Sequence, residues 1–166
     1  VLLAAPGVLA VANGGILTHP ATGRAKLNLP TMRPGLAYVS AGSGRVLEVA
    51  EPPEHLASLR HLARRADGLL AAAMQWQGDA AAAPALLALH RRGEPLRLLR
   101  APDHARLNGY GGSVTFSGDG RRVAVTSPRG GVAQVFDADS GAFLGQEAQA
   151  DVWGAAPAGP GVLVSE

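Results

Sequence analysis

The side chains best suited to chemistry are scattered along the chain. None of the five histidines belongs to an HxH, HxxxH or HExxH motif; they are His19, His55, His61, His90 and His104. On one strand, the six-residue step from His55 to His61 spans about 20 Å, too far to share a metal ion. The chain has no GxSxG motif and no cysteine, which removes thiolate chemistry. The sequence predicts no catalytic residue, no cofactor and no local metal site.

The charge pattern argues against nucleic acid as a partner. The 15 Lys and Arg residues barely exceed the 13 Asp and Glu residues, and aromatic residues make up only 4% of the chain. Single-stranded nucleic acid requires interleaved aromatic side chains on a basic groove. We interpret the paired arginines as solvated edges of turns; these pairs are Arg64-Arg65, Arg91-Arg92 and Arg121-Arg122.

The clearest structural signal lies between Asn108 and Gln146. This stretch contains four short segments rich in β-branched and aromatic residues: SVTFS, RVAVTS, VAQVFD and AFLGQ. The pairs Asp119-Gly120 and Ser140-Gly141 supply the residue types that tight hairpins need. Four antiparallel strands within about 40 residues are typical of one blade of a β-propeller.

The same pattern recurs along the chain. Three turn glycines, Gly44, Gly93 and Gly141, are 49 and 48 residues apart, close to the repeat length of propeller blades. The sequence therefore predicts an all-β fold, a partial β-propeller in a single domain. We expect three four-stranded antiparallel blades and the start of another, at residues 1–50, 56–101, 110–148 and 151–166.

The middle repeat also permits a helical interpretation. Leu56, Leu59 and Leu62 have helical spacing, and AAAAPALLALHRRG is rich in alanine and leucine. Taken alone, these features favour helices and an α/β domain. Alanine is abundant along the entire chain, so we give more weight to position in the repeat and expect strands here.

An inserted loop at residues 16–35 does not fit the repeat. It holds three prolines and lies between the second and third strands of blade one. Insertions of this length often carry function on a rigid scaffold, and a proline-stiffened cover over a blade edge is the alternative. Residues 1–15 are too short and too interrupted for a membrane span, and we expect a strand there. Because the chain begins at Val1 and ends within an apolar run, we interpret it as a fragment.

Propeller geometry predicts where a binding site would lie. Loops that leave the second strand and loops that enter the first strand of each blade share one face around the central channel. The candidate side chains on this face are cationic and rich in amides, which suits an anionic small ligand or an acidic protein partner. These candidates are Asn13, His19, Arg24, Lys26, Asn28, Arg60, His61, Gln75, Gln77 and Arg129, with Ser113, Ser127 and Trp153 on the same face.

Three stretches resemble a known bacterial family, domain of unknown function family 1513. They begin at VANGGILTHPATGRAKLNLPTMRPG, HLARRADGLLAAAMQWQG and GGSVTFSGDGRRVAVTSPRGG. The resemblance implies a Tat-exported, periplasmic propeller of roughly seven blades and about twice this length. It also implies genes beside imelysin-type iron-uptake proteins and dihaem cytochrome-like proteins. The family has no established activity, so it assigns no catalytic residue.

Three functional classes remain open. The first is a non-catalytic binding or scaffold propeller of the bacterial envelope, serving iron uptake or contacting a cytochrome. The second is a propeller enzyme, lactonase-like or quinoprotein-like, which needs acidic metal ligands in the channel; Asp151 is nearly the only carboxylate near the start of a first strand. The third is a purely structural array of blades. We favour the first class.

Overall fold

The computed structural model describes residues 1–166 as an all-β protein. Three four-stranded sheets and one two-stranded sheet contain every strand, and each strand pairs with its sequence neighbour. All of these pairings are antiparallel. The only helices are short 3-10 turns: η1 (Pro20–Thr22), η2 (Leu29–Thr31), η3 (Ala80–Ala82) and η4 (His104–Leu107). The predicted fold, three propeller blades and the start of another, is confirmed.

The sheets follow the repeat in chain order. Blade one comprises β1 (Leu2–Ala5), β2 (Val8–Asn13), β3 (Gly35–Ser40) and β4 (Val46–Ala50). Blade two comprises β5 (Ala57–Arg64), β6 (Leu70–Trp76), β7 (Leu87–His90) and β8 (Arg97–Leu99). Blade three comprises β9 (Ser113–Phe116), β10 (Arg122–Ser127), β11 (Val132–Asp137) and β12 (Phe143–Ala148). The two-stranded sheet comprises β13 (Gly154–Ala158) and β14 (Gly161–Ser165).

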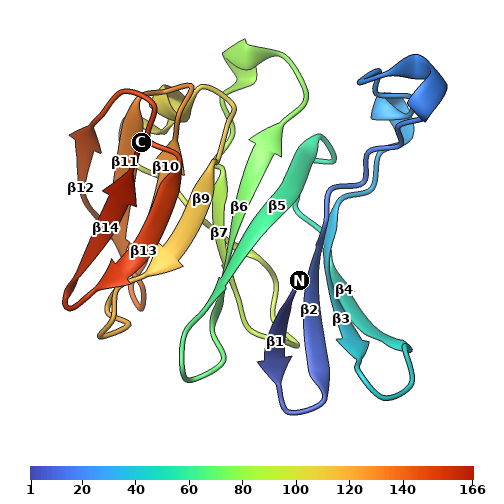
Figure 1. The fold of residues 1–166 in the computed structure, drawn as a ribbon, viewed down its shortest axis with the longest axis horizontal. Helices are drawn as coiled ribbons and strands as arrows, with labels where there is room; N and C mark the ends of the chain where they lie inside the picture. Colours follow the sequence, from blue (N-terminus) through green and yellow to red (C-terminus); the bar gives the residue numbers. More distant parts are fainter.

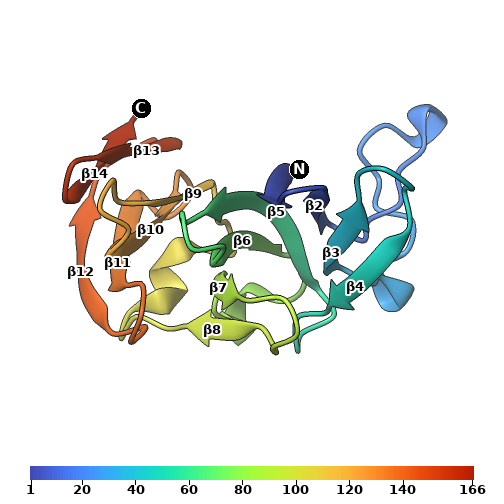
Figure 2. The ribbon, with the colours of Figure 1, turned by 90° about the horizontal axis from the view of Figure 1, so that it is seen from below.

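The blades fan out from their first strands. Figure 2 shows β1, β5, β9 and β13 on the inner side of an open arc, with β4, β8 and β12 along its outer rim. In Figure 1 the hairpin turns within β1–β2, β3–β4 and β5–β6 lie at one end of the blades, which we call the lower end. The loops that leave second strands and enter first strands lie at the opposite, upper end.

Blade two forms strands where local spacing favoured a helix. β5 pairs with β6 over its full length, interrupted by a bulge between Leu59 and His61. Residues Leu70 to Met74 of β6 are all buried, because blades one and three cover both faces of this sheet. Alanine lets neighbouring blades approach closely, so tertiary packing overrides its helix propensity.

The core is a series of seams between blades. One cluster of 26 buried apolar residues runs through the chain, from Ala4 in blade one to Ala138 after β11. Leu36 faces blade two, and Phe136 packs edge-on against Phe143 within blade three. Because every seam buries residues from two successive blades, the blades stabilise one another as repeats do.

The outer face of blade one is apolar from strand to strand. Successive pairing aligns Leu3 with Leu9, Leu9 with Val39, and Val39 with Val46. A second row aligns Val11, Ala37 and Val49. Leu3 and Val46 are each 57% exposed.

Residues 14–34, which we call the hook, rise from the upper end of blade one. Figure 1 shows two adjacent legs leading to a tip that stands apart from the blades. Asn28 joins the legs: its Oδ1 accepts from the Leu17 amide at 2.7 Å, and its Nδ2 donates to the Gly15 carbonyl at 2.9 Å. Gly15 has a φ of 70° and lies directly against the backbone of Arg33, where a Cβ would collide. These contacts hold the two legs of the hook against each other.

None of the helices has the length and apolar character needed to cross a membrane.

Candidate functional site

The predicted binding face begins at the seam between blades one and two. The guanidinium of Arg60 lies against Gly14, at 3.3 Å from the position that a Cβ would take there. Ser58, two residues earlier on β5, donates its hydroxyl to the Gly14 carbonyl at 2.8 Å. Arg60 occupies the β-bulge, and bulges commonly redirect a side chain next to a functional site. This places Arg60 at the upper inner edge of the array.

The same edge continues from blade two to blade three. Gln75 is the pairing partner of Ser58 within blade two, and it forms an isolated antiparallel bridge with Tyr110. Gln77 donates its Nε2 to the Gln75 carbonyl at 3.0 Å. Its Oε1 is buried without a hydrogen-bond partner, although buried polar atoms usually have one. This oxygen lies inside the seam, out of reach of solvent.

A group of stacked side chains lies where this edge reaches blade three. The Arg129 guanidinium lies 4.7 Å from the centre of the Tyr110 ring, within the range of a cation–π interaction. Tyr110 in turn meets Trp153 edge-on, with ring centres 6.1 Å apart. Contacts therefore link Arg60, Ser58, Gln75, Tyr110 and Arg129 in one continuous series, which we call the upper arc.

The cations of the upper end have no acidic partners. Every ion pair within 4.0 Å involves Arg65, His90, Arg91 or Arg92 with Glu48, Asp67 or Asp139, all nearer the lower end. Arg60 and Arg129 are both exposed and have no carboxylate within that distance. Their positive charge thus remains available to an anion from solution.

His61 follows Arg60 and is also exposed. Partial burial of its ring, together with the positive charge of Arg60, lowers the pKa of His61 below its ordinary value. Its imidazole is therefore neutral at neutral pH, so His61 adds hydrogen-bonding capacity to the arc and no charge.

The hook residues among the candidates lie apart from the upper arc. Asn13 accepts from the Gly15 amide at 3.0 Å, and Asn28 joins the two legs, so both side chains serve the loop itself. His19 caps η1 by accepting from the Ala21 amide at 3.2 Å. Arg24 and Lys26 are both exposed.

Ser127 was expected on the solvent-facing surface around the channel, but the structure places it in the interior. It is completely buried; its hydroxyl donates to the Leu107 carbonyl at 2.7 Å and accepts from the Gly130 amide at 3.0 Å. These bonds attach the turn after β10 to the loop that enters blade three. Nowhere do three or more histidine, aspartate or glutamate side chains gather in a way that could hold a metal ion.

Arginine clamps at the lower end were missed by sequence reasoning. Arg65 makes a two-pronged interaction with Asp67 and reaches blade three, donating to Gly120 O at 3.1 Å and to Asp139 Oδ1 at 2.7 Å. Arg64 donates to the Ala4 carbonyl of blade one at 2.8 Å. The Arg64-Arg65 pair is therefore interblade structure, although both residues lie beside a turn as predicted.

A buried polar pair joins blades one and two. The Tyr38 hydroxyl lies 2.7 Å from Nδ1 of His90, whose Nε2 lies 2.7 Å from the Glu94 carbonyl. A carbonyl only accepts, so Nε2 carries the proton and Tyr38 donates to Nδ1. Burial, reinforced by the negative charge of Glu48, raises the pKa of Tyr38 to about 12.

Comparisons with known proteins support the fold and give the family. The family model described as "Protein of unknown function (DUF1513)" matches residues 1–166. A search of curated protein sequences finds no match. Among solved structures, this chain is similar to hydrazine synthase of Kuenenia stuttgartiensis, with a TM-score of 0.52 and 11% identity. The match covers 71% of this chain and 31% of that one, and at this identity it shows the fold alone. The chain belongs to the DUF1513 family of proteins of unknown function.

Proposed function

We propose that this chain is a non-catalytic binding propeller whose upper arc holds an anionic group, from a small ligand or an acidic protein partner. The observation that carries the proposal is the charge arrangement of the arc. Arg60 and Arg129 belong to one connected edge and have no carboxylate within 4.0 Å. Arginine presents a planar fork of donors that matches a carboxylate.

Two further contacts support a binding role. Stacking on Tyr110 limits the orientations of the Arg129 side chain, which reduces the entropy lost when a ligand binds. Tyr110 is itself packed edge-on against Trp153, which holds in place the ring on which Arg129 stacks. Resemblance to exported propellers supports the periplasm as the location, with iron uptake or a cytochrome partner as the setting.

The proposal is tested by calorimetric titration of the full chain with citrate and with a glutamate-rich peptide. We expect Arg60→Ala and Arg129→Ala each to weaken binding about tenfold, or about 1.4 kcal/mol. Arg121→Ala is the matched control, because Arg121 is exposed at the lower end and forms no ion pair. Equal binding by the unmodified chain and both upper-arc variants would overturn the proposal.

A further inference from the structure

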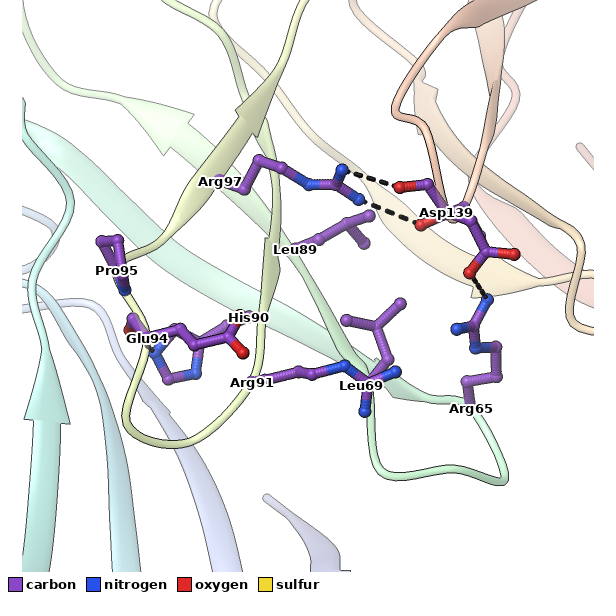
Figure 3. A pocket seen from close by; sticks show the side chains of 10 residues that line it. Arg65, Leu69, Leu89, His90, Arg91, Glu94, Pro95, Arg97 and Asp139 are labelled. Carbon is purple, nitrogen blue, oxygen red and sulfur yellow. Dashed lines mark hydrogen bonds and ion pairs between the residues drawn. The ribbon is translucent and has the colours of Figure 1, made fainter.

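A separate pocket lies at the lower end, on the seam between blades two and three. It is a cavity of about 280 Å³ that is open on one side. Figure 3 shows the side chains around it. The lining residues are Arg65, Leu69, Leu89, His90, Arg91, Glu94, Pro95, Arg97, Ala138 and Asp139. Pockets for drug-sized ligands begin near about 300 Å³, so this volume suits a smaller molecule.

Three hydrophobic residues form the apolar part of the pocket lining. Leu69 and Leu89 are 6% and 1% exposed, and Ala138 is completely buried. Pro95 contributes to the wall. An aliphatic group in this space would therefore leave water for a hydrophobic surface.

Two of the three pocket arginines are already neutralised. Arg65 pairs with both Asp67 and Asp139, and Arg91 pairs with Asp67. These contacts lower the pKa of the Asp67 carboxyl and raise that of the Arg65 guanidinium. Both arginines therefore line the pocket without offering it an unpaired charge.

Arg97 and Glu94 are the unmatched charges. Arg97 donates to the carbonyls of Ala138 at 3.1 Å and Asp139 at 2.7 Å, and has no carboxylate within 4.0 Å. The Glu94 carboxylate makes no ion pair either. Figure 3 shows Arg97 on one side of Leu89 and Glu94 on the other. The pocket thus offers one free cation and one free anion above an apolar floor.

We propose that this pocket binds a small aliphatic amino acid as its zwitterion. Arg97 contacts the carboxylate, Glu94 contacts the ammonium group, and Leu69 and Leu89 receive the hydrocarbon part. A simple carboxylate leaves Glu94 unmatched, and a simple amine leaves Arg97 unmatched, so the zwitterion is favoured over both. The site is distinct from the upper arc and does not depend on the function proposed for it.

The test uses the full chain and three matched probes followed by NMR titration: L-leucine, 4-methylpentanoate and 3-methylbutylamine. We expect saturable binding of leucine, with each single-charge analogue at least about fivefold weaker. A fourth probe, 6-aminohexanoate, shows whether the site prefers an α-amino acid or one whose two charges are widely separated. Tighter binding of either zwitterion than of the two single-charge analogues supports the proposal. Failure of both zwitterions to bind would overturn it.

Two variants test which pocket side chain contacts the ammonium group of leucine and which contacts its carboxylate. Glu94→Gln should remove the preference for leucine over 4-methylpentanoate, and Arg97→Gln should remove the preference over 3-methylbutylamine. Arg97 also joins two blades, so the melting temperature of Arg97→Gln is measured alongside. Glu94→Gln removes no side-chain contact within the chain and keeps the test valid if Arg97→Gln unfolds. Arg100→Gln, at the upper end, is the control, and unchanged leucine preference in Glu94→Gln would contradict the proposal.

Discussion

At the lower end of the blades Arg65 closes a seam, whereas at the upper end Arg129 is left for solvent. Arg65 is only 15% exposed; it pairs with Asp67 of its own blade and reaches across the seam to the Asp139 carboxylate and the Gly120 carbonyl of blade three. Arg129 is exposed, stacks on Tyr110 and has no acidic neighbour within 4.0 Å. The same residue type thus stabilises the fold at one end and carries unpaired charge at the other.

The difference shows how a repeat array separates stability from binding. A hairpin turn places the short acidic side chain of Asp67 beside Arg65, whose guanidinium is thereby oriented toward Asp139 of the following blade. Several loops at the upper end, the hook among them, are longer than the hairpin turns, and exposed side chains on such loops can vary without opening a seam. Substitutions at the two ends should therefore have opposite consequences for stability and for binding.

The largest expected effect is that of Arg65→Met on stability. We expect the free energy of unfolding to fall by about 2 kcal/mol, because Asp67 and Asp139 lose a charged partner and blade three loses one of its polar contacts with blade two. Urea denaturation followed by circular dichroism measures the change. Arg129→Met is the counterpart at the upper end and should cost less than about 1 kcal/mol. Equal losses in the free energy of unfolding for Arg65→Met and Arg129→Met would contradict the distinction between the two ends.

A smaller effect is expected from acid. Arg65 holds the pKa of Asp67 below its ordinary value, so Asp67 contributes stability above the unfolded-state pKa near 3.9, and this is lost as pH falls through the folded value. Asp67 is 44% exposed, which limits the contribution to about 1 kcal/mol.

The measurement compares urea midpoints of the unmodified chain and Asp67→Asn between about pH 5 and about pH 2. The variant should lose less stability over this range. Asp119→Asn tests a second carboxyl whose pKa is lowered, by bonds from Ser117 and the Arg121 amide, but which joins no arginine clamp. A parallel pH dependence in the unmodified chain and Asp67→Asn would show that the clamp is not charge-dependent.

The smallest effect concerns the stack at the upper end. Tyr110→Leu should weaken citrate binding about threefold, or about 0.6 kcal/mol, because Arg129 loses the ring that orients it. In a chain that already carries Arg129→Ala, the same substitution should have no further effect. Additive losses in that double variant would mean that Tyr110 contacts the ligand independently of Arg129.

The sequence was sufficient to predict the blades because their turns are local. Asp119-Gly120 forms its hairpin from adjacent residues, and Gly120 adopts the positive φ of 73° that the residue pair indicates. The repeat also gave the correct interpretation of blade two, where the spacing of Leu56, Leu59 and Leu62 favoured a helix.

The candidate site was less accessible from sequence, because its contacts join distant residues. Propeller geometry predicted that Arg60, Gln75 and Arg129 share one face, but Tyr110, which connects Gln75 with Arg129, carries no motif and meets Gln75 only across the seam. Likewise, nothing near Asn28 indicates that its amide bridges two legs of a loop to Gly15, 13 residues away.

The hook has a mechanical consequence. A flexible loop would act as a tether, and a molecule held at its tip would tumble independently of the blades. Here Asn28 bonds to Leu17 and Gly15, and close backbone contact at Gly15 fixes the base. Because the two legs are bonded to each other, a molecule bound at the tip would be held in a set orientation relative to blade one.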